Sequence, residues 1–238
     1  MKLDVLVFAA HPDDAELSMG GTIAKLTYHK HKVGIIDLTR GELGTRGTAE
    51  IRQKEASKAS SILKTEIREN FGIPDGYIQR TKENLVKIIT EIRKYKPKII
   101  FAPYFNDRHP DHIDTSKLVK EAVFASGLPK VMTTENKVKQ KAYRPDKLFY
   151  YMQTYTFEPT FIIDISKHFK TKMKAVKSYS TQFYDPKSSE PETFISNPKF
   201  LDYIESRAKF YGFQIRKDYG EPFFCEEDIE LDLGNYLK

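Results

Sequence analysis

Short, continuously apolar segments alternate with segments of helical periodicity over the first half of the chain, and this order constrains the fold more than any other feature. The apolar segments are residues 3–10, 32–38 and 98–104, each of strand length. Helical patterns follow them, through Leu26 and over residues 50–63, 84–95 and 113–125. Strands that are apolar throughout, not only at alternate positions, are typical of a parallel sheet covered on both faces. We therefore predict a Rossmann-like, doubly wound α/β fold with a mainly parallel sheet and helices on both faces.

The second half of the chain is less regular. We expect strands over residues 148–152 and 160–165, and helices over residues 166–180 and 197–210. Residues 184–198 are rich in Pro, Ser and Glu, and we expect them to form a loop that lies over a site. The chain is predicted to be a single domain over residues 1–238, with residues 145–238 as a C-terminal elaboration.

Composition and charge exclude several classes of protein. No apolar run approaches the roughly 20 residues that a membrane span needs, and the first apolar run has no signal-peptide cleavage pattern, so we expect a cytoplasmic protein without a membrane partner. The formal net charge is +6, but the lysines are spread along the chain, and we expect no nucleic-acid partner. Cys225 is the only cysteine, which excludes an intramolecular disulfide and a multi-cysteine metal site.

Two tetrads built around His-Pro-Asp mark the ends of two predicted strands. The tetrad His11-Pro12-Asp13-Asp14 follows the first strand, and His109-Pro110-Asp111-His112 follows the strand at residues 98–104. Proline disfavours helical backbone at the preceding histidine and suits the first position of a helix, so each tetrad predicts a strand-to-helix corner. The carboxyl ends of parallel strands share one edge, where open α/β proteins bind their ligands.

The spacing within the tetrads favours a hydrolytic metal site. Residues three apart in a helix face the same way, so His11 is expected to converge with Asp14, and His109 with His112. A hydrolytic zinc site uses three nitrogen or oxygen ligands and leaves one position open for water. His11, Asp14 and one histidine of the second tetrad supply the three ligands. Two histidines and a carboxylate also suit Fe²⁺. Asp13 would take a proton from the attacking water, and the other histidine would stabilise or protonate the intermediate. The simpler alternative is that each tetrad is only a capped helix start.

The residues around both tetrads resemble a known family. The segments AHPDDAELSMGGTIAKL and RHPDHIDT are similar to the LmbE/PIG-L family of zinc-dependent N-acetylglucosamine deacetylases, whose motifs are A-H-P-D-D-x-E and H-P-D-H. The loop at residues 37–47, Arg52 and Glu55 of an R-x-x-E helix, and residues 71–78 extend the resemblance. Residues 143–152 and 205–224 resemble the bacterial branch that includes the deacetylase of bacillithiol biosynthesis, which acts on N-acetylglucosaminyl-malate.

The resemblance implies a role for each matched residue. It implies a Zn²⁺ site made by His11, Asp14 and His112, with Asp13 as general base and His109 as an electrostatic or acid partner that Asp111 orients. It implies contacts to an acetylated amino-sugar substrate from Glu42, Arg52 and Asp75, and from Arg144 to a malate carboxylate. The family often forms homo-oligomers. The simpler alternatives are an exposed helix pair for Arg52 and Glu55, a turn residue for Asp75 and a surface cation for Arg144.

One feature departs from the family pattern. Some relatives carry a tyrosine shortly before the second tetrad, where this chain has Asn106-Asp107-Arg108, and Tyr184 is a candidate for its place. His29, His31 and His168 lie among lysines and are expected to be solvated.

Three other functions compete with this hypothesis. A nucleotide-binding Rossmann protein would carry G-x-G-x-x-G after the first strand, where this chain has carboxylates that repel a pyrophosphate. A nucleic-acid-binding module would bind in a salt-sensitive way and would leave both tetrads without a role. A related amidase could act on a thiol-conjugate amide or on another acetylated sugar, and composition does not separate these substrates.

Overall fold

The first apolar segment forms a central strand of the sheet. In the computed structural model, which describes residues 1–231, β1 (Val5–Ala9) lies between β2 (Val33–Asp37) and β4 (Ile99–Pro103). Alternate side chains of β1 join two different cores: Val5, Val7 and Ala9 on one face, Leu6 and Phe8 on the other. A strand buried on both faces is apolar at every position, which explains the continuous run in the sequence.

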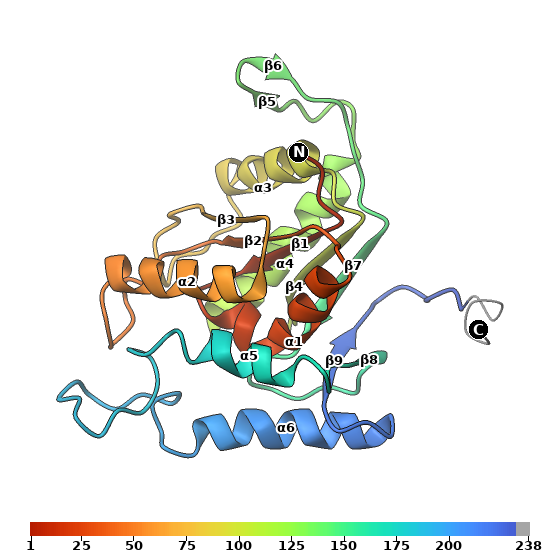
Figure 1. The fold of residues 1–238 in the computed structure, drawn as a ribbon. Helices are drawn as coiled ribbons and strands as arrows, with labels where there is room; N and C mark the ends of the chain where they lie inside the picture. Colours follow the sequence, from red (N-terminus) through yellow and green to blue (C-terminus); the bar gives the residue numbers. More distant parts are fainter. Residues whose placement is uncertain (232–238) are drawn as a thin grey trace.

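The sheet has seven strands in the order β3-β2-β1-β4-β7-β9-β8 (Figure 1). The first five, including β3 (Ile67–Asn70) and β7 (Lys147–Tyr151), are parallel, whereas β9 (Gly220–Phe224) pairs antiparallel with β7 and with β8 (Phe161–Asp164). The predicted doubly wound, mainly parallel α/β fold is therefore confirmed. Neither β3 nor β9 was predicted from the sequence, because β3 is largely polar and β9 contains glycine and proline.

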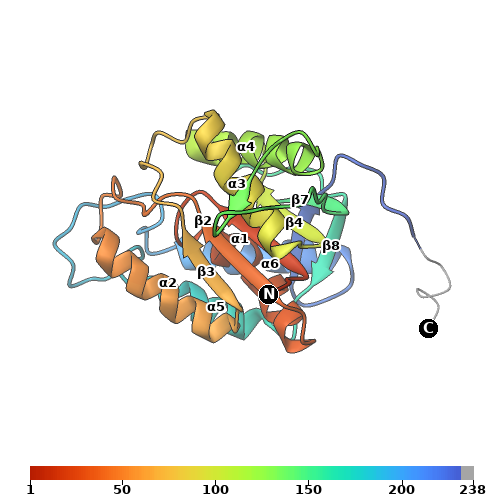
Figure 2. The same ribbon diagram turned by 90° about the horizontal axis from the view of Figure 1, so that it is seen from above.

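Helices cover both faces of the sheet (Figures 1 and 2). On one face lie α3 (Lys82–Tyr95) and α4 (Pro110–Ser126), and on the other lie α1 (Asp14–Tyr28), α2 (Ala49–Leu63) and α5 (Phe169–Val176). The helix α6 (Phe200–Gln214) contacts β8 and β9 and lies below α5 in Figure 1. The helix expected over residues 166–180 is shorter than predicted, and the hairpin of β5 (Thr134–Glu135) and β6 (Val138–Lys139) was not predicted. Within residues 1–231, no helix is long and apolar enough to cross a membrane.

The connections of the sheet place a topological switch point at the carboxyl ends of β1 and β4. After β1 the chain moves outward to β2 and β3, then returns to the other side of β1 to form β4. Helices leave the carboxyl ends of β1 and β4 in opposite directions, and such a switch point is where open α/β sheets bind ligands. Both tetrads lie here, because His11 follows β1 and His109 follows β4.

Candidate metal centre and active site

The corner after β1 is strained at Asp13. This residue has φ 114° and ψ −27°, a backbone conformation that residues other than glycine adopt rarely. Such strain costs about 1–3 kcal/mol and tends to occur at functional sites. Arg52 supports the corner, since its Nη2 donates to the carbonyl of Pro12 at 2.6 Å and lies 3.4 Å from Oδ2 of Asp13. The neighbouring carboxylates of Asp13 and Asp14 consequently meet different partners.

The corner after β4 follows the predicted geometry. His109 is extended (φ −89°, ψ 123°), and Pro110 occupies the first turn of α4. The Nδ1 atom of His109 accepts the backbone N–H of Asp111 at 3.2 Å. An imidazole that accepts at Nδ1 carries its proton on Nε2 when it is neutral, so His109 can donate a hydrogen bond from Nε2.

The structure brings the three predicted metal ligands together. His11, Asp14 and His112 are buried, and each offers a ligand atom within 4.8 Å of the other two. The two carboxylate oxygens of Asp14 divide between the histidines: Oδ2 lies 3.5 Å from Nδ1 of His11, and Oδ1 lies 3.2 Å from Nε2 of His112. The rings of His109 and His112 stack with centroids 5.0 Å apart, as their spacing predicts.

Asp111 contacts a different histidine from the one expected. Its Oδ2 lies 3.2 Å from Nε2 of His11 and accepts the backbone N–H of Gly76 at 2.8 Å. Only the backbone of Asp111 bonds to the ring of His109. The first turn of α4 directs the side chain across to the loop before α3, so its carboxylate faces His11 and not His109.

Asp107 is a site residue that the sequence analysis missed. Its Oδ1 lies 2.8 Å from Nδ1 of His112 and accepts the backbone N–H of His109, while its Oδ2 accepts the N–H of Thr154. This carboxylate therefore fixes the ring of His112, the role that such acids commonly play beside metal-binding histidines. The available signal was an acidic residue in the short loop between a strand and the second tetrad, where some relatives carry a tyrosine.

Carboxylates predominate around the histidines of the two tetrads, where Asp13, Asp14, Asp75, Asp107 and Asp111 are all buried. Burial raises the pKa of Asp13 to about 7, although Arg52 opposes this shift. Burial also lowers the pKa of His112, but Asp14 and Asp107 outweigh it and raise the value to about 9. The same competition raises the pKa of His11 well above its usual range, through Asp111, Asp14 and Asp75. A site that draws protons onto two histidines attracts positive charge, and its donor set fits a divalent cation.

The third histidine of the site, His109, has a different environment. Burial, followed by the charges of His11 and His112, lowers the pKa of His109. His109 is therefore neutral near pH 7, in agreement with the acceptor role of its Nδ1 atom.

The predicted substrate-binding residues fall into three environments. Arg52 and Asp75 are buried and line a cavity beside the tetrads, and Asp75 Oδ1 lies 3.0 Å from Nε2 of His11. Glu42 is exposed and accepts the backbone N–H of Asp75 at 2.9 Å, so it supports the site from outside the cavity. Arg144 does not reach the cavity. It donates to the carbonyl of Phe124 at the far end of α4 and stacks on that ring.

The cavity has a volume of about 410 Å³ and is walled by both halves of the chain. Thr193, Phe194 and Ile195 line it, so part of the loop expected to lie over a site does so. Tyr184 is exposed and outside the lining, whereas Tyr203 of α6 belongs to it. Further lining residues that the sequence did not suggest are Gln153, Thr154 and Arg207, which come from the C-terminal third.

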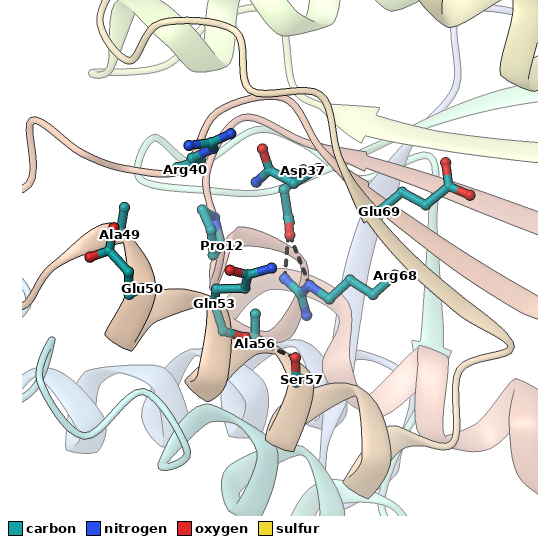
Figure 3. Close-up of a pocket in the computed structure, with 11 residues that line it drawn as sticks. Pro12, Asp37, Arg40, Ala49, Glu50, Gln53, Ala56, Ser57, Arg68 and Glu69 are labelled. Carbon is teal, nitrogen blue, oxygen red and sulfur yellow. Dashed lines mark hydrogen bonds and ion pairs between the residues drawn. The ribbon is translucent and has the colours of Figure 1, made fainter.

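A second cavity, of about 350 Å³, lies between α2 and the ends of β2 and β3 (Figure 3). Pro12 lines it, as shown in Figure 3, while Asp13 lines the first cavity. Its Arg68 binds Asp37 through Nε and Nη2, at 2.8 and 2.9 Å, and also pairs with Glu16 of the first tetrad's helix. This arginine is the counterion of two buried acids, Asp37 and Glu16.

Known proteins are similar to this chain in sequence and in fold. Residues 6–123 match the family model PIG-L, described as GlcNAc-PI de-N-acetylase. The diacetylchitobiose deacetylase of Thermococcus kodakarensis is 31% identical over 191 residues, which are 75% of this chain and 70% of that protein. The chain belongs to the PIG-L family of deacetylases.

Two solved structures extend the comparison beyond the family model. A conserved protein from Thermus thermophilus has 36% identity and a TM-score of 0.86 over 96% of this chain and 97% of its own. The N,N'-diacetylchitobiose deacetylase from Pyrococcus horikoshii has 28% identity and a TM-score of 0.79 over 92% of this chain and 82% of its own. The similarity to both solved structures extends over the C-terminal third of the chain, where α6 and the loops before it supply part of the cavity wall.

Proposed function

We propose that this PIG-L family member is a metal-dependent N-deacetylase that hydrolyses the acetamide of an N-acetylglucosaminyl compound. The observation that carries the proposal is the buried group of His11, Asp14 and His112, which opens onto a cavity that Asp13 and His109 also line. Its two histidines and one carboxylate fit Zn²⁺, and also Fe²⁺. When bound there, such a cation supplies Lewis acidity, which polarises the acetamide carbonyl and makes water more acidic.

The residues of the chain divide the proton transfers between them. Asp13 removes a proton from the attacking water as the oxygen of that water bonds to the acetamide carbon. His109, neutral and protonated on Nε2, donates a hydrogen bond to the oxyanion that forms on the carbonyl oxygen. Asp13 then returns the proton to the nitrogen as the C–N bond breaks. The products are acetate and a free amino sugar, and Asp13 is regenerated as a carboxylate.

Within this class we propose N-acetylglucosaminyl-L-malate as the substrate, which places the enzyme in bacillithiol biosynthesis. Arg144 does not support this choice, because it lies at the far end of α4. Support comes from Arg108, which lines the cavity and forms no ion pair among residues 1–231. Its guanidinium stacks on the ring of Phe194, which leaves its charge available to a carboxylate of the substrate.

An acetate-release assay tests both levels of the proposal. The purified protein is compared on N-acetylglucosaminyl-L-malate, N-acetylglucosamine and N,N'-diacetylchitobiose, before and after exhaustive chelation and after readdition of Zn²⁺ or Fe²⁺. We expect release that chelation abolishes and metal restores, with the malate conjugate hydrolysed fastest. Activity that survives exhaustive chelation would contradict the metal-dependent mechanism. Faster hydrolysis of diacetylchitobiose, the compound named for the relatives, would contradict only the malate assignment.

A further inference from the structure

The helix α1, which begins at the metal ligand Asp14, is broken in its middle. Met19 has φ −137° and ψ 21°, which are not helical values, and two glycines, Gly20 and Gly21, follow it. Glycine is about 0.8–1.0 kcal/mol less favourable than alanine inside a helix, and sharp kinks commonly occur at such residues. The sequence therefore weakens α1 at the point where it breaks.

Residues far away in the sequence pair the backbone groups next to the break. The N–H groups of Gly21 and Thr22 donate to the two carboxylate oxygens of Glu221, at 3.0 and 2.6 Å. The carbonyl of Leu17 accepts from Nη2 of Arg207 at 3.2 Å. In an unbroken helix, the N–H of Gly21 would instead donate to the carbonyl of Leu17. Glu221 of β9 thus accepts the N–H of Gly21, and Arg207 of α6 donates to the carbonyl of Leu17, so both groups of the missing helical hydrogen bond have partners.

The carboxylate that caps the break is itself neutralised. Glu221 is only 1% exposed, and Nζ of Lys172, which is 2% exposed, lies 2.6 Å from its Oε1. A buried charge of this kind is tolerated when it has both a counterion and hydrogen-bond partners, and Glu221 has both. The two glycines allow the side chains of Lys172 and Ile165 to pack closely against α1. A Cβ at Gly20 would lie 3.2 Å from Cγ of Lys172, and a Cβ at Gly21 would lie 2.6 Å from Cδ1 of Ile165.

The segment before the break belongs to the site. It runs from Asp14 to Ser18, and the side chain of Leu17 lines the cavity. The hydroxyl of Ser18 donates to the side chain of Gln153, which also lines the cavity and whose carbonyl accepts from Arg207. The orientation of this segment relative to the rest of α1 therefore determines where Asp14 meets His11 and His112.

We propose that Glu221 and Arg207 are positioning residues, which hold α1 broken at Met19 so that its first turn presents Asp14 to the metal centre. The inference rests on the proposed metal-dependent function. Glu221 and Lys172 do not line the cavity, so they act only through the helix. Arg207 lines the cavity and fixes the carbonyl of Leu17 at the same time.

The test measures Co²⁺ binding in the absence of substrate, by titration and by the visible absorption spectrum of the bound ion. Glu221→Gln keeps the shape of the side chain but has one acceptor oxygen for two N–H donors, and it leaves Lys172 unpaired. The double variant Lys172→Met/Glu221→Gln removes both members of the buried pair, which commonly restores stability. Arg207→Lys keeps the charge but replaces the two guanidinium nitrogens, which donate one to each carbonyl of Leu17 and Gln153, by a single ammonium nitrogen.

Arg93→Lys is the matched control. Arg93 is buried and donates to the carbonyls of Ser126, Leu128 and Val131, outside the lining of the cavity. It reports what losing a buried arginine does to thermal stability alone.

We expect Glu221→Gln and Arg207→Lys to bind Co²⁺ about 10–100-fold more weakly and to change its spectrum, as is typical when an outer residue that orients a ligand is lost. The double variant should recover thermal stability and still bind weakly, whereas Arg93→Lys should lose stability and bind normally. Wild-type affinity and spectrum in the double variant or in Arg207→Lys would overturn the positioning role. Failure of the wild-type protein to bind Co²⁺ would overturn the metal centre itself.

Discussion

Two adjacent aspartates have opposite electrostatic surroundings in this site. Burial raises the pKa of Asp13 to about 7, with Arg52 in opposition. Burial acts the same way on Asp14, but His112 and His11 outweigh it and hold the pKa of Asp14 well below its usual range. A carboxylate that stays ionised suits a metal ligand, and one that titrates near neutrality suits a proton carrier. The left-handed backbone at Asp13 creates this difference, because it sends the two side chains to different partners.

Replacing Asp13 by Asn tests its role as a base. Asn is preferred to Ala because it adopts positive φ more readily, and Asp13 has φ 114°. We expect kcat to fall about 10²–10⁴-fold, since the variant cannot accept a proton. Bound metal, measured by elemental analysis after gel filtration, should be retained. The exposed Asp202 gives the control variant, Asp202→Asn. Normal turnover by Asp13→Asn would contradict the mechanism.

Asp107 supports a second prediction. Because its carboxylate fixes the ring of His112, Asp107→Asn is expected to weaken metal binding about 10–100-fold. A chelator competition assay measures this loss, with exposed Asp146→Asn as the control. Unchanged affinity would mean that α4 alone holds the ring of His112.

The residues of the site differ in how far sequence could identify them. His11 and Asp14, like His109 and His112, are three apart at a strand-to-helix corner, so local geometry alone predicts that each pair converges. Gln153 and Arg207 reach the site through tertiary structure, and no spacing in the sequence links them to the tetrads. Asp107 lies only two residues before His109, but the sequence does not show which way its carboxylate points. Asp111 contacts the ring of His109 through its backbone N–H, whereas its carboxylate faces His11, because a motif states proximity along the chain and not side-chain direction.

At the scale of elements, hydrogen bonds link two loops beside the cavity, the loop between β2 and α2 and the loop that follows α5. Glu55 of α2 accepts the hydroxyls of Ser180 and Thr181 and the backbone N–H of Thr181, at 2.8–3.0 Å. Next to them, Gln182 donates to the carbonyl of Arg46 at 2.8 Å. The helix α2 thus connects both loops to the site. Its Arg52 contacts the first tetrad and the loop after β2, and its Glu55 contacts the second loop, which follows α5.

Glu55→Ala should release the second loop without altering the metal centre. Hydrogen bonds to a charged group contribute about 1.5–3 kcal/mol, so we expect a clear loss of unfolding free energy. We also expect faster amide hydrogen exchange at residues 181–196 and a higher KM with metal affinity unchanged. Glu83→Ala, on the exposed start of α3, is the control. Equal exchange in the two variants would contradict the anchoring role.

The elements also show why some were predicted and others were not. The first, second and fourth strands lie inside a parallel sheet, so burial on both faces makes them apolar throughout. By contrast, β3 lies at the edge of the sheet and is largely polar, and β9, although buried, contains Gly220, Glu221 and Pro222. The break in α1 had a signal in its two glycines, but its partners, Glu221 and Arg207, lie about 200 residues further along the chain, where local patterns carry no information.

At the scale of the whole molecule, an excess of basic residues surrounds an acidic centre. The formal net charge is +6, yet Asp13, Asp14, Asp75, Asp107 and Asp111 are all buried around the first cavity. Without a cation, protons on His11 and His112 provide the compensating charge. The stability of the metal-free protein should therefore depend on pH differently from that of the metal-loaded protein.

The sign of this dependence follows from His112 and Asp13. In the metal-free protein the pKa of His112 is about 9, above the value of about 6.5 in an unfolded chain. Its stabilising contribution is therefore complete below pH 6.5 and is lost as the pH rises to 9. Asp13, with a pKa raised from 3.8 to about 7, acts in the same direction at lower pH. A bound cation requires neutral imidazoles and displaces these protons, so its stabilising effect grows with pH.

We expect thermal unfolding from pH 6 to 9 to show a Tm that falls with pH after chelation and a flatter curve with metal. The chelated His112→Asn variant should also give a flatter curve. Parallel curves with and without metal would contradict a centre in which protons and a cation compete for the same histidines.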